Sequence, residues 1–250
     1  MKNSGAIRVG IGGWVYPPWR GAFYPPGLRQ AEELAYASRH VTAIEINGTF
    51  YRIQTPASFK KWHDETPDDF VFSLKGPRFL THRTELASAA PYMERFFASG
   101  LLDLGDKLGP ILWQFAPTKE FAAADLAAFL KLLPREIKGR RLRHVIEARH
   151  KSFAAPAFLD LLRQDGVALA RVDDAHHPEF AGLTADFAYL RLRRCTEAEP
   201  TGYKPDALDR WAEHAKNCAA EGRDVFLYFI NGAKVRAPAA AQAMIQILVT

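Results

Sequence analysis

The most constraining feature of this chain is a series of short apolar runs, several of which end at their carboxyl side in a charged or amide residue. These terminal residues are Glu45, Asn47, Lys75, Gln114, Glu147, Arg191 and Asn231. In a closed parallel barrel, the carboxyl ends of the strands meet around one mouth, and such barrels carry their active sites there. The pattern therefore predicts where the protein works.

The apolar runs alternate with longer segments of helical composition. The expected strands are Ile7–Gly12, Thr42–Asn47, Phe70–Lys75, Ile111–Phe115, His144–Glu147, Val167–Val172, Phe187–Leu192 and Val225–Ile230. The expected helices are Glu32–Arg39, Pro56–Asp64, Pro91–Leu102, Ala123–Leu133, Pro156–Gln164, Pro205–Ala219 and Ala237–Leu248. About eight strands in 250 residues predict an α/β fold, a closed (β/α)8 TIM-type barrel that forms a single domain over residues 1–250.

A doubly wound open sheet is the competing architecture. It would place a Gly-x-Gly-x-x-Gly turn after the first strand, whereas the chain has Gly10-Ile11-Gly12-Gly13-Trp14-Val15-Tyr16 there. The sequence therefore lacks the best signal of a dinucleotide-binding fold, and the closed barrel is favoured.

Composition indicates the cellular compartment in which the protein is expected to work. No run approaches the roughly 18 apolar residues of a membrane span, and the amino-terminal residues lack the apolar stretch of a secretory signal. Cys195 and Cys218 are far apart and have no paired spacing, as expected for reduced thiols. We predict a soluble, cytoplasmic protein with no membrane partner. No protein partner can be inferred from the sequence.

Strand parity predicts which side chains share the barrel interior, because successive side chains of a strand alternate between its two faces. The inward sets expected from this count are Glu45 and Asn47; Val71, Ser73 and Lys75; Leu112 and Gln114; Val145, Glu147 and Arg149; Leu169, Arg171 and Asp173; Tyr189, Arg191 and Arg193; and Phe229 with Asn231. One concave rim would then hold acids, amides and cations together. Burying any of them without a partner would cost several kcal/mol, which favours a functional site.

Several of these residues lie in longer motifs. The motifs are Pro18-Trp19-Arg20-Gly21-Ala22-Phe23-Tyr24-Pro25, Glu45-Ile46-Asn47-Gly48-Thr49-Phe50-Tyr51, Lys75-Gly76-Pro77-Arg78, Thr81-His82 and Glu147-Ala148-Arg149-His150. In this combination and order, from about Arg8 to the last helix, the chain resembles the YecE-like family, a domain of unknown function. The resemblance implies a TIM-type barrel distantly similar to the endonuclease-IV and xylose-isomerase barrels, with no settled activity to carry over.

The chain departs from that family pattern at three places. Arg193-Arg194 stands where the family more usually shows His-Gly, Ile230-Asn231 where it shows Asn-Asn, and Phe153 where Trp is common. A reaction or ligand that depends on those positions would be altered in this protein.

The cations at the expected mouth indicate an anionic ligand. Arginine pairs grip phosphate or carboxylate through bidentate bonds, and a lysine supplies a point charge or a nucleophile. Lys75, Arg149 and Arg191 would play these parts, Glu45 and Glu147 would transfer protons or coordinate ions, and Asn47, Gln114 and Asn231 would orient the ligand. An enzyme of this kind would be a hydrolase, lyase or isomerase. Glycoside hydrolysis by the two glutamates is disfavoured, because the nearby cations would keep both carboxyl groups ionised.

Further candidates lie in the loops around the mouth. Trp14, Tyr16, Trp19 and Tyr51 would stack on a sugar or base, or simply pack within their loops. His82 would be an acid or base near neutral pH, or would order its loop. A divalent metal is a further cofactor hypothesis, with ligands drawn from Glu45, Glu147, His150, Asp173, Asp174, His176 and His177, although their spacing matches no standard site.

Two other classes of function stay open. Nucleic-acid binding or processing is suggested by the net charge of +5 and the sequence pI near 9.2, but the basic residues are spread thinly. The densest basic run, Lys138–Arg143, precedes a strand and therefore lies at the end of the barrel away from the mouth. A non-catalytic sensor of a small anion would use the same mouth without a reaction.

Overall fold

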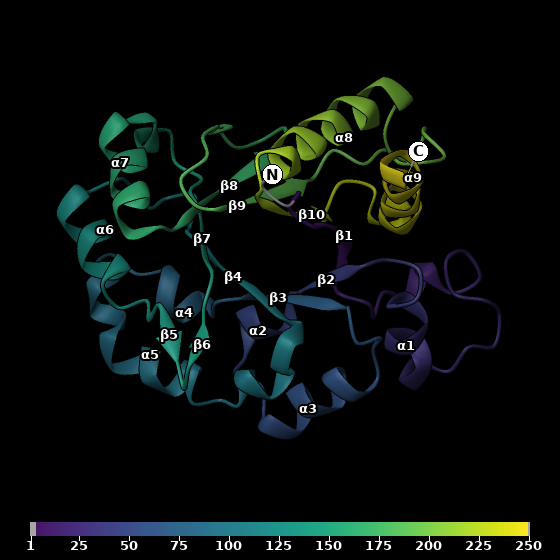
Figure 1. The fold of residues 1–250 in the computed structure, drawn as a ribbon, viewed down its shortest axis with the longest axis horizontal. Helices are drawn as coiled ribbons and strands as arrows, with labels where there is room; N and C mark the ends of the chain where they lie inside the picture. Colours follow the sequence, from purple (N-terminus) through teal and green to yellow (C-terminus); the bar gives the residue numbers. More distant parts are fainter. Residues whose placement is uncertain (1–3, 250) are drawn as a thin grey trace.

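The computed structural model, which describes residues 4–249, is a closed barrel of eight parallel strands in the order β1-β10-β9-β8-β7-β4-β3-β2 (Figure 1). The strands are β1 (Ile7–Gly12), β2 (Ala43–Ile46), β3 (Val71–Lys75), β4 (Leu108–Gln114), β7 (His144–Glu147), β8 (Ala168–Asp173), β9 (Phe187–Leu192) and β10 (Asp224–Phe229). This architecture confirms the TIM-type α/β barrel, and each of the eight expected strands overlaps an observed one.

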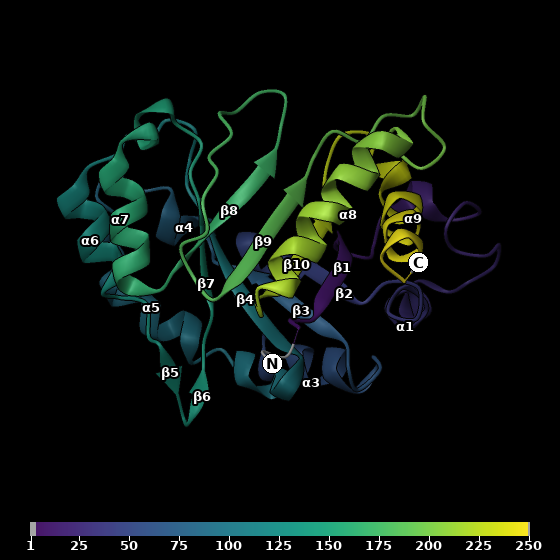
Figure 2. The same cartoon turned by 45° about the horizontal axis from the view of Figure 1, so that its top comes forward.

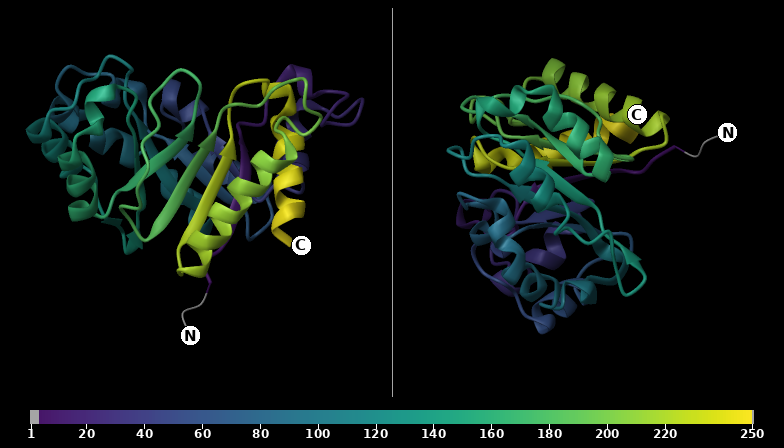
Figure 3. Two further views of the ribbon diagram at one scale, coloured as in Figure 1. Left: turned by 90° about the horizontal axis from the view of Figure 1, so that it is seen from above. Right: turned by 90° about the vertical axis from the view of Figure 1, so that its left-hand side faces the viewer.

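Helices form the outer layer around the barrel (Figure 3). The α-helices are α1 (Glu33–Ala37), α2 (Gly48–Tyr51), α3 (Pro56–Asp64), α4 (Arg78–Thr81), α5 (Ala90–Phe97), α6 (Ala123–Leu130), α7 (Pro156–Asp165), α8 (Pro205–Ala220) and α9 (Ala237–Val249). Short 3-10 turns are η1 (Pro17–Trp19), η2 (Gln30–Glu32), η3 (Leu86–Ala89), η4 (Leu101–Lys107), η5 (Lys151–Ala154) and η6 (Lys234–Arg236). Several helices begin at or near a proline, which is already fixed at a helical φ angle.

The helical layer is incomplete on one side. The connection between β8 and β9, residues 174–186, contains no helix and runs as an extended loop (Figure 2). Thr184 ties this loop to the amino end of β8, since its hydroxyl accepts from Leu169 N at 2.9 Å and donates to Val167 O at 2.7 Å. Across residues 4–249, no helix has the length and apolar character needed to cross a membrane.

Local backbone chemistry explains where the elements differ from expectation. The expected helix Pro91–Leu102 is interrupted at Gly100, whose left-handed φ of 94° ends α5 and starts η4. The basic run forms a small hairpin of β5 (Glu136–Ile137) and β6 (Arg140–Arg141), which turns at Lys138 and Gly139 with positive φ.

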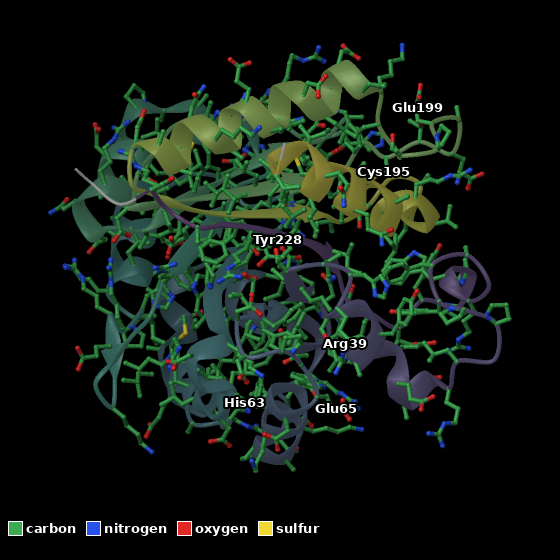
Figure 4. All side chains as sticks on the ribbon, turned by 45° about the vertical axis from the view of Figure 1, so that its right-hand side comes forward. Arg39, His63, Glu65, Cys195, Glu199 and Tyr228 are labelled. Carbon is green, nitrogen blue, oxygen red and sulfur yellow. The ribbon has the colours of Figure 1, made fainter. Side chains whose placement is uncertain are left out.

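Two apolar cores stabilise the fold. The larger core lies between the strands and the helices, and the smaller one fills the barrel interior. The interior core consists of Ala43, Leu112, Val145, Ala168, Ala170, Val172, Phe187, Tyr189, Phe226, Tyr228 and Ile230. Tyr228 is fully buried and lies near the centre of the molecule, whereas His63 and Glu65 lie toward its lower side (Figure 4). The Tyr228 hydroxyl is 2.7 Å from Ser73 Oγ, which links β10 to β3 across the barrel.

The residues of the interior core show that the inward faces expected for β8 and β10 are wrong. On β8 the inward residues include Ala170 and Val172, so Arg171 and Asp173 lie on the outer face, where Arg171 pairs with Glu179. On β10, Tyr228 is inward and Phe229 belongs to the outer core. Both strands carry apolar residues on both faces, so alternation gave no signal, and a polar residue near the strand end was wrongly counted as inward.

Candidate functional site

A buried arginine organises the carboxyl-terminal mouth of the barrel. Arg191, on β9, is 1% exposed, and its guanidinium holds Glu45 of β2 in a bidentate pair with N–O distances of 2.9 and 2.8 Å. Arg191 Nη1 also donates to Glu147 at the end of β7. The Tyr189 hydroxyl donates to Glu45 Oε2 at 2.9 Å. Both carboxylates are at most 1% exposed, so one guanidinium joins β9 to β2 and β7, neither of which is next to β9 in the barrel.

Gln114, at the end of β4, connects three cations. Its Oε1 accepts from Arg149 Nη2 at 2.8 Å, from Lys75 Nζ at 3.2 Å and from Arg191 Nη1 at 3.4 Å. Arg149 also donates to Glu147 Oε1 at 2.6 Å and keeps 13% of its side chain exposed. The amide oxygen thereby holds the positive groups side by side without adding a negative charge.

Lys75 differs from the other two cations because it has no carboxylate partner. Lys75 ends β3 and is 6% exposed, and its ammonium lies 4.1 Å from the centre of the Phe50 ring. Within residues 4–249, no ion pair joins Lys75 to an acidic side chain, whereas Arg149 and Arg191 both pair with Glu147. Three cations therefore share two buried carboxylates, and one positive charge is left uncompensated.

The pKa values in this cluster follow from its charges. Burial raises the pKa of Glu147, but the charges of Arg191, Arg149 and Lys75 outweigh burial and bring the pKa down to about 2. Burial also opposes the charge of Arg191, yet Glu147 and Glu45 hold its pKa above the ordinary value. For Lys75, burial and then the charge of Arg191 lower the pKa to about 8. Of these three groups, only Lys75 titrates near neutral pH.

The lowered pKa of Lys75 predicts how the free energy of unfolding changes with pH. The pKa of Lys75 falls from an ordinary 10.5 to about 8 on folding, so the unfolded chain binds the proton more tightly. The destabilisation is therefore fully present below pH 8, shrinks as pH rises and is gone above about pH 10.5. We expect the free energy of unfolding of the wild type to rise over this range, relative to Lys75→Met, by about 3 kcal/mol. Urea unfolding of both proteins at several pH values measures this difference, and parallel curves would contradict it.

The remaining candidates occupy different parts of the mouth. Asn47 is half-buried just past β2, and a Cβ atom added to Gly12 would lie 3.0 Å from its Nδ2. Tyr16 is half-buried in the loop after β1, with the Lys234 ammonium 4.8 Å from its ring centre. Trp19 is fully buried, and its Nε1 donates to Lys234 O at 2.9 Å. The structure thus places the Trp19 ring in the core of its loop rather than on the mouth surface.

Tyr51, His82 and His150 line the approach to the mouth. Tyr51 is 67% exposed, and His82 is exposed with its ring edge-on to Phe50. Burial, followed by the charges of Arg149, Arg78 and Lys75, lowers the pKa of His82. His150 caps η5, and its Nδ1 lies 2.8 Å from Ser152 Oγ, an arrangement that orders the loop.

Asp173 and Asn231 lie outside the central cluster. Asp173 accepts from the Tyr203 hydroxyl at 3.1 Å and pairs with Arg194 at 2.8 Å. The Asn231 amide lies 2.8 Å from Arg193 Nη2, and Arg193 also pairs with Asp174. Two of the residues that depart from the family pattern, Arg193 and Arg194, thus join the loops after β8, β9 and β10.

The positions of the acidic and histidine side chains bear on the divalent-metal hypothesis. Within residues 4–249, no three His, Cys, Asp or Glu side chains are grouped so that they could hold a metal ion. Asp174 is instead engaged by Arg193, by His176 N at 2.8 Å and by His177 Nδ1 at 3.1 Å. The two strand-end glutamates are committed to arginines.

Two contributors were not recognised as site residues from the sequence. Strand parity had placed Tyr189 inward, and its bond to Glu45 could have been suspected from that position. Phe50, whose ring lies beneath the Lys75 ammonium, gave no such signal because it belongs to the short helix α2.

Comparison with known proteins places the chain among proteins of undetermined function. Residues 8–250 match the family model described as "Protein of unknown function DUF72". The chain is 23% identical to the UPF0759 protein YunF of Bacillus subtilis over 272 aligned positions, covering 97% of this chain and 94% of YunF. It is 29% identical to the UPF0759 protein YecE of Escherichia coli over 152 positions, but that match spans 60% of this chain and only 50% of YecE.

Solved structures share the fold. A DUF72 family protein from Thermotoga maritima superposes with a TM-score of 0.79 at 22% identity, covering 98% of this chain and 99% of that one. A DUF72 family protein from Enterococcus faecalis gives a TM-score of 0.74 at 18% identity, with both chains fully covered. SacUVDE gives 0.57 at 14% identity, covering 96% of this chain and 99% of its own. At these identities the similarity is one of fold alone.

Proposed function

The chain belongs to the DUF72 family of proteins of unknown function, and we propose that the mouth of its barrel binds a small anionic ligand through a phosphate or carboxylate group. The protein would hold the ligand with Lys75 and Arg149, which are buried less completely, at 6% and 13% exposed, than Arg191 at 1%. Arg191 would contribute charge from beneath them, because its donors already bind Glu45, Glu147 and Gln114.

The observation that carries this proposal is the uncompensated ammonium of Lys75. A buried charge without a counter-ion is costly, and a bound anion would remove that cost while using donors that the protein leaves available. The only hydrogen bond formed by Lys75 Nζ within residues 4–249 is the one to Gln114 at 3.2 Å, so other donor positions on the ammonium remain.

The charges of the cluster also favour one residue for proton transfer. A carboxyl group with a pKa of about 2, as in Glu147, is a poor acid or base at neutral pH. Lys75, with a pKa of about 8, is suited to accept or release a proton or to act as a nucleophile. We therefore infer that the glutamates serve to position the arginines, and that any acid/base or hydrolytic step would use Lys75.

Ligand-dependent thermal unfolding tests the binding proposal. We expect one class of small anion, among inorganic phosphate, sugar phosphates and carboxylates, to raise Tm, because a ligand that binds only the folded state stabilises it by mass action. At 100 times Kd the gain is about 2.7 kcal/mol, which corresponds to several degrees. Lys75→Met should abolish the gain while leaving a protein that still folds.

The matched control is Lys131→Met, which removes an exposed lysine after α6, away from the mouth. This variant should keep the full response to the anion. Equal responses in Lys75→Met and the wild type would mean that the ligand binds elsewhere, and the absence of any response across all three classes of anion would oppose the proposal.

The ion pairs on the surface bear on the alternative function, nucleic-acid binding. The basic hairpin does not support nucleic-acid binding, because Arg140, Arg141 and Arg143 pair with Asp106, Asp186 and Asp224 at 3.1, 2.9 and 2.7 Å. A non-catalytic anion sensor would use the same mouth, and turnover that depends on Lys75 would distinguish an enzyme from a sensor. Cytoplasmic location and a single domain over residues 1–250 stay predictions.

A further inference from the structure

Exposed aromatic rings gather on one side of the mouth. Within residues 4–249, the aromatic side chains that are largely exposed are Tyr51, Phe79 and Tyr92, at 67, 37 and 43%. They lie on α2, α4 and α5, which follow β2 and β3, and the Phe79 and Tyr92 ring centres are 6.1 Å apart. Exposed aromatic rings that lie next to a charged pocket provide flat surfaces on which a planar ligand can stack.

Arginines accompany these rings and lack acidic partners. The Arg78 guanidinium lies 5.8 Å from the Tyr51 ring centre, and that of Arg83 lies 4.6 Å from the Tyr92 ring centre. We call these five residues, Tyr51, Arg78, Phe79, Arg83 and Tyr92, the aromatic rim. Within residues 4–249 neither rim arginine forms an ion pair with a carboxylate, in contrast to the arginines of the hairpin at the opposite end of the barrel.

The aromatic rim is continuous with the anion site. The Phe50 ring contacts Lys75 at 4.1 Å on one side and has its centre 5.3 Å from that of Tyr51. His82 is edge-on to the same Phe50 ring at 5.5 Å. His82 and Arg83 also line an open pocket of about 630 Å³, together with Lys119 and Phe121. Lys75 and Arg149 do not line this pocket, so the stacking surface beside a ligand anchored at Lys75 is that of the Tyr51 ring, next to Phe50.

We propose that the anion bound at the mouth is a nucleotide, either free or as a unit of single-stranded nucleic acid, with its phosphate at Lys75 and Arg149 and its base stacked on the aromatic rim. The inference rests on the proposed anion site and names its ligand class. Guanidinium groups bind phosphate oxygens bidentately, and bases of every kind stack on aromatic rings and on arginine planes. Arg83 already donates to Phe79 O and Ser88 Oγ, whereas a carboxylate or a simple sugar phosphate would leave the aromatic rings and Arg78 unused.

The test compares adenosine 5′-monophosphate with ribose 5-phosphate, which carries the same phosphate and sugar but no base. Titration calorimetry on the whole protein should give AMP an affinity about tenfold higher, which is the size of effect expected from stacking one base. Tyr51→Leu should remove this advantage and leave ribose 5-phosphate binding unchanged. Tyr51→Phe keeps the ring and should preserve the advantage.

A labelled single-stranded oligonucleotide of eight residues distinguishes the two sources of the nucleotide. Tighter binding of the oligonucleotide than of AMP, weakened by salt and by Arg78→Met but not by Arg163→Met, would identify a strand. Arg163→Met is the control because that arginine lies on α7 and pairs with Asp160. Equal affinities would identify the free nucleotide.

Two outcomes separate this inference from the proposed function. If ribose 5-phosphate binds as well as AMP, and both depend on Lys75, the anion site stands and the nucleotide inference fails. If neither the nucleotide nor the sugar phosphate responds to Lys75→Met, the anion site itself is wrong at this position, and the inference falls with it.

Discussion

Arg191→Met is expected to lower the free energy of unfolding by about 3–5 kcal/mol, the range found when one partner of a buried ion pair is removed. Arg191 makes the bidentate pair with Glu45 and also bonds Glu147, and all three side chains are at most 1% exposed. Without the guanidinium, Glu45 keeps the Tyr189 hydroxyl as its partner but has no paired cation. Urea unfolding monitored by circular dichroism measures the loss.

Arg191→Lys and Arg210→Met complete this comparison. A lysine keeps the charge but cannot form the planar bidentate pair with Glu45, so its loss should be intermediate. Arg210 pairs with Asp206 on the surface of α8, where both side chains are more than 60% exposed, and its removal should change stability by less than about 1 kcal/mol. If Arg191→Met proved as mild as Arg210→Met, the buried cluster could not be organised around Arg191.

Gly10→Ala is the second substitution for which we expect a large effect. A Cβ atom at position 10 would lie 2.1 Å from the carbonyl oxygen of Ala43 and 3.1 Å from the Tyr228 ring. Ala43 is the residue paired with Gly10 in the parallel sheet, so the oxygen belongs to backbone that cannot move without disturbing the barrel. We expect a loss of about 3 kcal/mol or more, since overpacking against backbone exceeds the usual penalty for an added methylene.

Gly48→Ala is the matched control for this clash. Gly48 is the first residue of α2, and the nearest atom to an added Cβ is the Gln54 side-chain nitrogen at 3.7 Å, an ordinary contact. Its stability should change by less than about 1 kcal/mol, with a small gain from the reduced freedom of the unfolded chain. A soluble Gly10→Ala protein with the wild-type unfolding midpoint would contradict the close approach of β1 and β2 at Gly10 and Ala43.

Much of this fold could be predicted from local patterns. The expected strands His144–Glu147 and Phe187–Leu192 have the observed bounds, and the expected helix Pro56–Asp64 is α3. These segments combine a clear apolar run or helical composition with an unambiguous start or end. The break at Gly100 could not be placed because it depends on a left-handed backbone that a glycine permits but does not require.

The central residues of the candidate site could also be predicted from the sequence. Glu45, Lys75, Gln114, Glu147 and Arg191 were expected together at the mouth, and their mutual hydrogen bonds place them there. Parity worked on these strands because a polar residue interrupts an otherwise apolar inner face. It was wrong for Asp173 and Asn231, because both faces of β8 and β10 are apolar; Asp173 ends β8 on the outer face, and Asn231 lies in the loop after β10.

The surroundings of the site depended on information that the sequence does not carry. Trp19 and Tyr51 looked alike as loop aromatics, yet Trp19 is fully buried and Tyr51 is 67% exposed. The absence of an acidic partner for Lys75 was equally hidden, because the chain has 28 acidic residues and only the folded arrangement determines which cations they neutralise.

The hydrogen bonds that cross the barrel determine how cooperatively the protein unfolds. Glu45, Lys75 and Gln114 come from the first half of the chain, whereas Glu147, Arg149 and Arg191 come from the second. Arg191 and Glu45 are 146 residues apart, and Ser73 and Tyr228 are 155 apart. Opening the barrel into halves would leave ionised side chains without their partners on both sides. A half-barrel therefore has little stability of its own. The polar cluster therefore couples the two halves, and we expect them to unfold together as one unit.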